Sequence, residues 1–180
     1  MVAEFETPIS VDDARTRKTY YTEMTTVRRL ATPVVLGAFR LLAEVRIFGA
    51  EKLPAEGAVV LAANHLTNFD VLPLQMAAAA RPIFFMGKEE LFRNPLADWA
   101  LRQLGGFPVY RGANDEWAML HAEKVLRQGQ VLGIFPEGSR SKGKGLKTAK
   151  TGAARLALLT GSSIVPVAVH GPQYIFRRVS

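Results

Sequence analysis

Short apolar runs alternate with amphipathic stretches along this chain from residue 59 onward. A short apolar run bounded by Gly, Pro or Asn predicts a strand, and apolar positions three or four residues apart predict a helix. The alternation of the two predicts an α/β fold, a single domain with a largely parallel mixed sheet flanked by helices. The predicted strands are Val59–Ala63, Pro82–Met86, Phe107–Tyr110, Val131–Phe135 and Ile164–Val169, the last two of them buried. The predicted helices are Asp70–Ala80, Pro95–Leu104, one capped by Asn114 or Asp115 that stops near Gly129, and Thr151–Thr160, which ends at Gly161.

An amphipathic segment, residues 23–48, comes before this region. Charged residues interrupt its apolar stretch at Arg40, Glu44 and Arg46, so we do not expect a membrane-spanning helix. Two interpretations fit: an interfacial helix that rests on anionic headgroups, or a core-facing helix with a solvated basic side. The apolar positions at helical spacing are Leu30, Val34, Leu41 and Val45, and the added positive charges are Arg28, Arg29 and Arg40.

Composition narrows the class of protein. The 180 residues, 48% of them apolar, suit one domain with a substantial core. A formal charge of +7 suits an anionic partner, and because no nucleic-acid-binding motif is recognisable, we expect no nucleic acid. The absence of cysteine excludes disulfides, thiolate metal sites and a cysteine acyl-enzyme. Residues 1–22 are polar and lack the apolar core of a secretory signal, which predicts a cytoplasmic protein.

A histidine and an aspartate follow the first predicted strand, in Asn64-His65-Leu66-Thr67-Asn68-Phe69-Asp70. Residues five apart on a helix point about 140° away from each other, so His65 and Asp70 can meet only if the chain turns between them. Thr67 and Asn68 favour such a turn. Asp70 would then fix the imidazole tautomer, and His65 would take a proton from a hydroxyl group. A solvated histidine beside a helix-start aspartate is the plain alternative for this pair alone.

A second polar segment, Phe135-Pro136-Glu137-Gly138-Ser139-Arg140-Ser141, follows the strand predicted at Val131–Phe135. It places a carboxylate, a hydroxyl and a guanidinium around a glycine, with backbone N–H groups free to face an anion. These are the groups of a phosphate site.

Together the two segments resemble the first and third blocks of the glycerolipid acyltransferases, the family of 1-acylglycerol-3-phosphate acyltransferase. Gly105–Gly112 resembles the second block, in which an arginine binds the phosphate of the acceptor, and Arg111 is that arginine here. Ser163–Val169 resembles the fourth block. There are two departures. Thr67 stands where the family more often has serine, and Pro108-Val109-Tyr110 replaces a commoner apolar run, which leaves the identity of the acceptor open.

The resemblance implies an acyltransferase domain over residues 49–180, with the chain ending sooner after the fourth block than is usual in the family. It implies acyl transfer from acyl-CoA or acyl-carrier protein to the hydroxyl of lysophosphatidic acid, which gives phosphatidic acid in phospholipid biosynthesis. His65 would be the base and Asp70 would stabilise the imidazolium. No metal and no cofactor beyond the thioester donor are expected. The enzyme would be peripheral on the inner face of the cell membrane, bound to its anionic surface.

The expected acceptor site follows from the same resemblance. Arg111 and Arg140 would clamp the phosphate through paired hydrogen bonds. Glu137 would orient a clamp arginine or the loop backbone, and Gly138 and Ser139 would approach the phosphate through backbone and hydroxyl groups. Lys88 resembles a family lysine near the acceptor, and a surface lysine is an equal alternative. A group of large apolar residues is expected either to line an acyl tunnel or, as such side chains more often do, to fill the core. These residues are Phe84, Phe85, Phe92, Leu96, Trp99 and Leu101.

Three alternatives remain open. Another lyso-lipid or a glycolipid could be the acceptor. A nucleotide-binding enzyme is a remote alternative, because Gly138–Lys144 satisfies most of a phosphate-loop pattern but Gly145 stands where Ser or Thr must hold magnesium. A non-enzymatic membrane-binding module would explain the charge and leave His65, Asp70 and Glu137 without a role.

Overall fold

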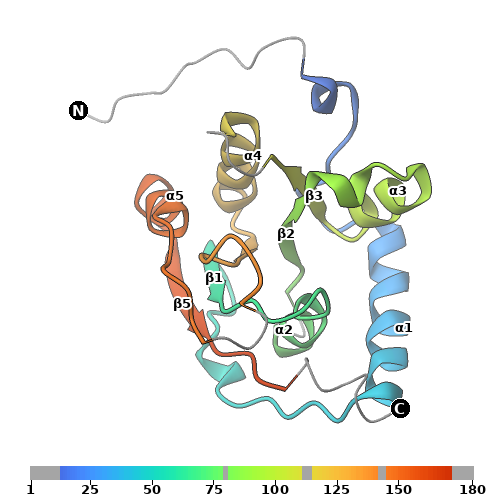
Figure 1. Ribbon diagram of the computed structural model, residues 1–180, viewed down its shortest axis with the longest axis vertical. Helices are drawn as coiled ribbons and strands as arrows, with labels where there is room; N and C mark the ends of the chain where they lie inside the picture. The colour runs from blue at the N-terminus through green and yellow to red at the C-terminus, as the bar shows by residue number, and fades with distance from the viewer. Residues whose placement is uncertain (1–12, 79–80, 111–114, 142–144, 172–180) are drawn as a thin grey trace.

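Five parallel strands form the sheet of the computed structural model, which describes residues 13–78, 81–110, 115–141 and 145–171 (Figure 1). The strand order is β3-β2-β4-β1-β5, and all four pairings between them are parallel. The predicted α/β fold is therefore confirmed. The strands are β1 (Val59–Ala63), β2 (Ile83–Lys88), β3 (Gly106–Val109), β4 (Val131–Ile134) and β5 (Ser163–Val167).

Helices connect the strands and lie on both faces of the sheet. The helix predicted over Asp70–Ala80 begins at Val71 and ends at Ala77. Asp70 stands at its N-cap position, but its carboxylate makes no capping hydrogen bond and instead accepts from the loop before it. Of the two caps considered for the fourth helix, Asp115 accepts from the Ala118 N–H, and Asn114 lies outside the described residues. The α-helices are α1 (Thr26–Leu42), α2 (Val71–Ala77), α3 (Pro95–Gln103), α4 (Glu116–Arg127) and α5 (Gly152–Thr160), and the short 3-10 helices are η1 (Ala14–Arg17), η2 (Ala50–Lys52) and η3 (Glu89–Phe92).

Two apolar clusters cover the two faces of the sheet. On one face, Phe84 and Leu132 from the sheet pack with residues of α4 and α5, including Leu126 and Leu156. On the other face, strand residues pack with Leu74 of α2. Because β1, β4 and β2 are covered on both sides, their carboxyl ends form a rigid edge from which loops can project.

The last strand differs from its prediction as a buried strand. Ile164 in β5 is 46% exposed, and no residue of β5 is fully buried. β5 lies at the edge of the sheet, where it pairs with β1 alone among the described strands. The apolar run therefore indicated a strand here but did not indicate that this strand lies at the edge of the sheet.

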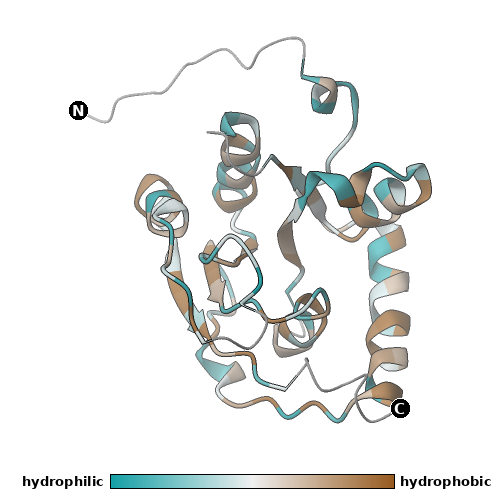
Figure 2. Ribbon diagram, viewed as in Figure 1, coloured by the Kyte–Doolittle hydropathy of each residue, from teal (hydrophilic) through white to brown (hydrophobic). Residues whose placement is uncertain are grey.

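Helix α1 presents an exposed apolar face and is held to the sheet by an arginine. Figure 2 shows hydrophobic and hydrophilic residues alternating along this helix. Leu30, Val34 and Leu41 are 68%, 70% and 89% exposed, so these three positions do not face the core, whereas Phe39 of the same helix is buried. No helix in the described part of the chain is long and apolar enough to cross a bilayer. The helix ends at Leu42, so Val45 lies beyond it, in the segment that leads to η2.

Arg28 was predicted among the charges that would face lipid headgroups, and this prediction is wrong. Its guanidinium is buried, donates to the backbone oxygen of Ile83 at 2.6 Å and lies over the Phe84 ring. Burial lowers the pKa of Arg28 to about 10. Gly105 leaves room for it, because a Cβ there would lie 2.4 Å from the Arg28 Nη1. Arg28 thus fastens α1 to β2, a role that helical periodicity does not reveal.

Candidate active site

His65 and Asp70 meet in the loop after β1, as the turn between them predicts. The imidazole Nδ1 lies 2.9 Å from Asp70 Oδ2. The Asp70 side chain is fully buried, whereas that of His65 is 12% exposed. Residues 67–70 form turns before α2 begins, and this reversal brings the two side chains together.

Asp70 accepts hydrogen bonds from three consecutive residues of the loop. Besides His65, its carboxylate accepts from the backbone N–H groups of Leu66 and Thr67 and from the Thr67 hydroxyl at 2.8 Å. Burial acts to raise the pKa of Asp70, but these hydrogen bonds outweigh burial and lower it below the ordinary value. An ionised carboxylate can only accept, so Nδ1 of His65 must donate to it. The neutral imidazole therefore carries its lone pair on Nε2, as a general base requires.

The loop after β4 lies directly against the histidine. The Phe135 ring stacks on the imidazole, with centroids 4.0 Å apart and an angle of 16° between the planes. Glu137 Oε1 accepts from the His65 N–H at 3.1 Å, and the Ser141 N–H donates to the His65 carbonyl. Because β1 and β4 are neighbours in the sheet, their loops meet across 72 residues of sequence. Asp70 thus fixes the Nδ1 edge of the imidazole, and Phe135 covers one face of the ring.

Glu137 accepts hydrogen bonds from loop backbone on both sides of the candidate site. Its second oxygen accepts from the backbone N–H of Lys147 at 3.1 Å, and its side chain is buried. Glu137 therefore connects the His65 loop to residues 145–150, which approach α5. This arrangement matches the expected role in orienting the loop backbone.

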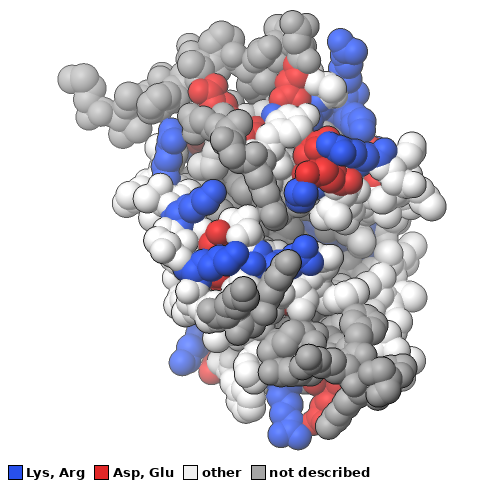
Figure 3. Space-filling model, viewed as in Figure 1, with Lys and Arg blue, Asp and Glu red and all other residues white. Residues whose placement is uncertain are grey.

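Two lysines border the loop that carries the expected phosphate-binding groups. Lys147 Nζ donates to Ser139 Oγ at 2.9 Å and to the Arg140 carbonyl at 2.8 Å. Lys150 lies against Gly138, whose φ of +66° is one that L side chains rarely adopt. Lys and Arg side chains gather over this loop in the space-filling view (Figure 3). The run of basic residues after Ser141 is visible in the sequence, but its contact with Ser139 and Gly138 is not.

The remaining expected site residues do not all lie beside His65. Gly138 and Ser139 lie in the loop beside His65, and Arg140 next to them is exposed. Lys88 ends β2, two strands from β1, and forms an ion pair with Glu90 at 2.6 Å. Arg111 lies outside the described residues.

A cavity of about 590 Å³ lies between the end of α1, the segment after it, α2 and β5. Its walls include Phe39, Leu61, Leu74 and Val167, which suit a hydrocarbon chain. Asn64 joins one wall to the His65 loop, since its side chain exchanges two hydrogen bonds with the backbone of Val169. The aromatic and aliphatic residues predicted for an acyl tunnel are absent from this lining. Phe84 and Phe92 are buried, whereas Leu96 and Trp99 are exposed by 73% and 48%.

Metal chemistry has no evident site in the part of the chain that the structure describes. No group of three or more His, Asp or Glu side chains there is arranged to hold a metal ion. His65 can transfer a proton, and the loop after β4 can bind an anion.

Comparison with known proteins gives consistent similarities. Residues 44–170 match the family model described as Acyltransferase. The chain is 33% identical over 135 residues to the 1-acyl-sn-glycerol-3-phosphate acyltransferase of Borreliella burgdorferi. This alignment covers 74% of this chain and 54% of that protein. It is 34% identical over 128 residues to the lyso-ornithine lipid O-acyltransferase of Pseudomonas aeruginosa, which covers 70% of this chain and 47% of that one.

A solved structure shares the fold. The 1-acyl-sn-glycerophosphate acyltransferase of Thermotoga maritima matches with a TM-score of 0.64 and 27% identity, over 85% of this chain and 65% of that one. The chain thus spans about half to two thirds of the length of these relatives.

Proposed function

The chain belongs to the acyltransferase family, and we propose that it moves a fatty acyl group from a thioester donor to the hydroxyl of 1-acylglycerol-3-phosphate. The observation that carries this proposal is the His65–Asp70 pair, held at 2.9 Å directly against a loop rich in anion-binding groups. The relative from Borreliella burgdorferi is named for this acceptor. The donor is acyl-CoA or acyl-carrier protein, and no other cofactor is needed.

The proposed reaction uses the free nitrogen of His65. Nε2 takes the proton of the acceptor hydroxyl as its oxygen attacks the thioester carbonyl. An oxygen–carbon bond forms, the carbon–sulfur bond breaks, and the sulfur leaves as a thiolate, which needs little acid assistance. Asp70 stabilises the imidazolium through the hydrogen bond to Nδ1. The proton then returns from the imidazolium to the thiolate or to solvent.

The phosphate of the acceptor is proposed to bind beside this base. Arg140 and the Ser139 hydroxyl, next to Gly138 in the loop after β4, offer donors there, and Arg111 joins them through the family resemblance. Lys147 supports this assignment, because its ammonium donates to Ser139 Oγ and leaves the hydroxyl proton free to point outward. Lys88 is also proposed to lie at the acceptor site. Its ion pair with Glu90 must break before its ammonium can contact the acceptor.

A membrane surface is the proposed location of the reaction. The acceptor is a lipid, and α1 offers an exposed apolar face of Leu30, Val34 and Leu41 bordered by the exposed Arg29 and Arg40. A helix of this kind lies in the interface with its apolar side among the acyl chains. Peripheral binding to an anionic leaflet follows from the same arrangement.

An acyl-transfer assay tests the function. Purified protein is given acyl-CoA or acyl-carrier protein with lysophosphatidic acid, lyso-ornithine lipid, other lyso-lipids or glycerol-3-phosphate. We expect thiol release that depends on lysophosphatidic acid, and Arg140→Ala to weaken use of this acceptor by about 2 to 4 kcal/mol in transition-state binding. Lyso-ornithine lipid, which carries no phosphate, should respond less. A preference for it in the wild type would reassign the acceptor, and ATP hydrolysis without transfer would contradict the family chemistry.

A further inference from the structure

The aromatic ring that covers the candidate base belongs to a series of three nearly parallel rings. Phe135 lies on the imidazole of His65, with centroids 4.0 Å apart and an angle of 16° between the planes. The ring of Phe85 lies on Phe135 with centroids 6.4 Å apart and again 16° between the planes. β2 carries Phe85, β4 leads into Phe135, and β1 leads into His65. Because β4 lies between β2 and β1 in the sheet, Phe135 is the middle ring of this aromatic stack.

A glycine in β4 makes room for the outer ring of the stack. Gly133 pairs with Phe85 of β2 on one side and with Leu61 of β1 on the other. A Cβ at Gly133 would overlap the Phe85 ring, 2.6 Å from its Cδ1, and would lie 2.8 Å from Ile83 Cγ2. Gly133 and Phe135 are two residues apart, so they face the same side of the sheet. Phe85 therefore lies directly over the glycine and supports Phe135 from the β2 side.

The hydrogen bond to Asp70 fixes only one edge of the imidazole. It holds Nδ1 of His65, 2.9 Å from Asp70 Oδ2, and the ring can still tilt about this contact. Such a tilt displaces Nε2, the nitrogen that must come within hydrogen-bond distance of the acceptor hydroxyl. A flat ring stacked on one face opposes the tilt, so Phe135 supplies the restraint that Asp70 does not.

The same contact favours the charged form of the base during transfer. The face of a benzene ring carries partial negative charge and attracts a cation that lies on it. His65 becomes an imidazolium as Nε2 takes the proton, and the Phe135 ring lies on its face at that moment. Phe135 has no group that could exchange a proton or bind a phosphate, so any effect it has on the reaction passes through His65.

We infer that Phe135 is a positioning residue for acyl transfer: it fixes the plane of the His65 imidazole, and Phe85, lying over Gly133, holds Phe135 in place. The inference rests on the proposed function for the role of His65 as the base. It gives three apolar residues a part in turnover, although none of them carries a reactive group. For Phe85, which was expected to line an acyl tunnel or fill the core, it names a contact that leads to the base.

Phe135→Leu tests the inference, because it keeps an apolar side chain and removes the ring. It should lower kcat about tenfold, since a small displacement of a reacting group costs up to about two orders of magnitude. The KM for lysophosphatidic acid should stay within about twofold, because ground-state binding is not involved. Phe135→Tyr keeps the ring and should retain kcat within about twofold of the parent. Phe85→Leu removes only the support and should lower kcat by a smaller factor, about threefold.

The ring protons of His65 report the stack without any activity measurement. A proton over the face of an aromatic ring is shifted upfield in the NMR spectrum by the ring current. Hε1 and Hδ2 of His65 should therefore resonate upfield in the parent and in Phe135→Tyr, and they should move downfield in Phe135→Leu. The chain has three histidines, and the signals that disappear in His65→Ala are those of His65.

Phe84→Leu is the matched control, because Phe84 precedes Phe85 in β2 and packs on the opposite face of the sheet. It removes a fully buried ring and costs stability, but it should leave kcat within about twofold. In a His65→Ala background, Phe135→Leu should add little to the loss of kcat, because its effect passes through His65. Circular dichroism at the assay temperature confirms that each variant is folded, and Phe85→Leu decides the question if Phe135→Leu does not fold.

Four results would overturn the inference. They are parental kcat in folded Phe135→Leu or Phe85→Leu, an equal loss of kcat in Phe84→Leu, a fully additive loss in the His65→Ala background, and His65 ring protons that do not move in Phe135→Leu. If the wild type transfers no acyl group, the proposed function fails instead, and the chemical shifts still decide whether Phe135 holds the imidazole.

Discussion

At the scale of single residues, Asp70 both orients the base and organises the loop that carries it. The carboxylate accepts hydrogen bonds from His65, Leu66 and Thr67, and it is fully buried. An amide at this position could accept at one oxygen only, and its NH2 group would face backbone donors. A substitution of Asp70 is therefore expected to affect both its proposed catalytic role and the structure of the loop, whereas a substitution of the His65 side chain mainly affects the proposed chemistry.

His65→Ala should lower the turnover of acyl transfer by at least about a hundredfold, the usual minimum for loss of a general base. Its stability should fall less than that of Asp70→Asn, because the Asp70 carboxylate keeps its hydrogen bonds from Leu66 and Thr67 when the imidazole is removed. Asp70→Asn should lower activity by a similar or smaller factor and also reduce the free energy of unfolding by about 2 to 3 kcal/mol, because buried donors lose their acceptor. Steady-state kinetics and urea unfolding measure the two effects. Wild-type turnover in His65→Ala would refute the mechanism.

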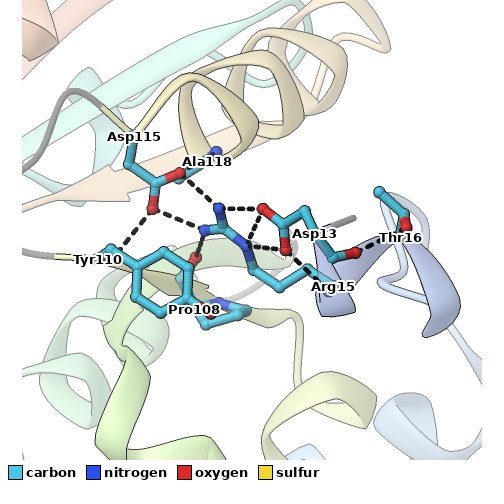
Figure 4. Close-up of polar contacts among 7 residues, drawn as sticks. All are labelled: Asp13, Arg15, Thr16, Pro108, Tyr110, Asp115 and Ala118. Atoms are coloured by element: carbon cyan, nitrogen blue, oxygen red, sulfur yellow. Dashed lines mark hydrogen bonds and ion pairs between the residues drawn. The ribbon is translucent and has the colours of Figure 1, made fainter. Parts of the chain in front are cut away.

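Residue roles were predictable where a local pattern set them. The five-residue spacing of His65 and Asp70 required a turn, and the structure contains it. Arg28 and Arg15 were not predictable, because their partners lie 55 and 100 residues away and only the tertiary fold brings them close. Figure 4 shows the Arg15 guanidinium against the Asp115 carboxylate, which accepts two hydrogen bonds from it. Arg15 stands in a polar stretch and Arg28 in an amphipathic one, and in neither case do the neighbouring residues indicate burial beside carbonyl or carboxylate groups.

At the scale of helices and strands, the parallel sheet explains why two separate loops form one candidate site. The loops after β1 and β4 leave neighbouring strands at the same edge, and the register pairs Leu61 with Gly133. Element types were predictable from apolar periodicity, with ends that differ by a few residues. The exposed position of β5 was not, since periodicity reports side-chain character and not which strand lies at the edge.

Helix α1 gives a prediction for liposome flotation. A Leu30→Ser/Val34→Ser/Leu41→Ser variant should lose binding to anionic vesicles at every salt concentration, because it removes the apolar face. An Arg29→Gln/Arg40→Gln variant should lose the salt-sensitive part, about 1 kcal/mol for each charge. Arg28 is left unchanged, since it is buried.

The matched control for flotation is Leu158→Ser in α5, where the side chain is 86% exposed on a different helix. It should float like the parent. If the α1 variants also float like the parent in both neutral and anionic vesicles, the membrane contact lies elsewhere.

At the scale of the whole molecule, His121 makes stability depend on pH. It lies among Trp117, Phe107 and Tyr20, and its Nε2 finds no hydrogen-bond partner among the residues that the structure describes. Burial, with a smaller contribution from Lys124, lowers the pKa of His121 to about 4. The unfolded chain, with an ordinary histidine pKa near 6.5, binds a proton that the folded protein does not.

The free energy of unfolding should therefore fall as the pH drops from about 6.5 toward 4, by about 2 kcal/mol between pH 7 and pH 5. Urea titrations at several pH values measure it. His121→Phe keeps an aromatic ring against Trp117 and Phe107 and should flatten the dependence in this range. An equally steep fall in His121→Phe would assign the dependence to other groups.

The strand order also determines when this site can exist during synthesis. β1 lies between β4 and β5, both of which follow it in the chain, and Val59 pairs with Val131 and Ser163. A ribosome-bound chain therefore exposes the apolar β1 without either sheet neighbour until most of the domain has emerged. During that interval His65 has neither Phe135 nor Glu137 beside it. The proposed base gains these neighbours only by late, long-range pairing, so the same topology that builds the candidate site leaves the interior strand β1 open to aggregation while the chain is being made.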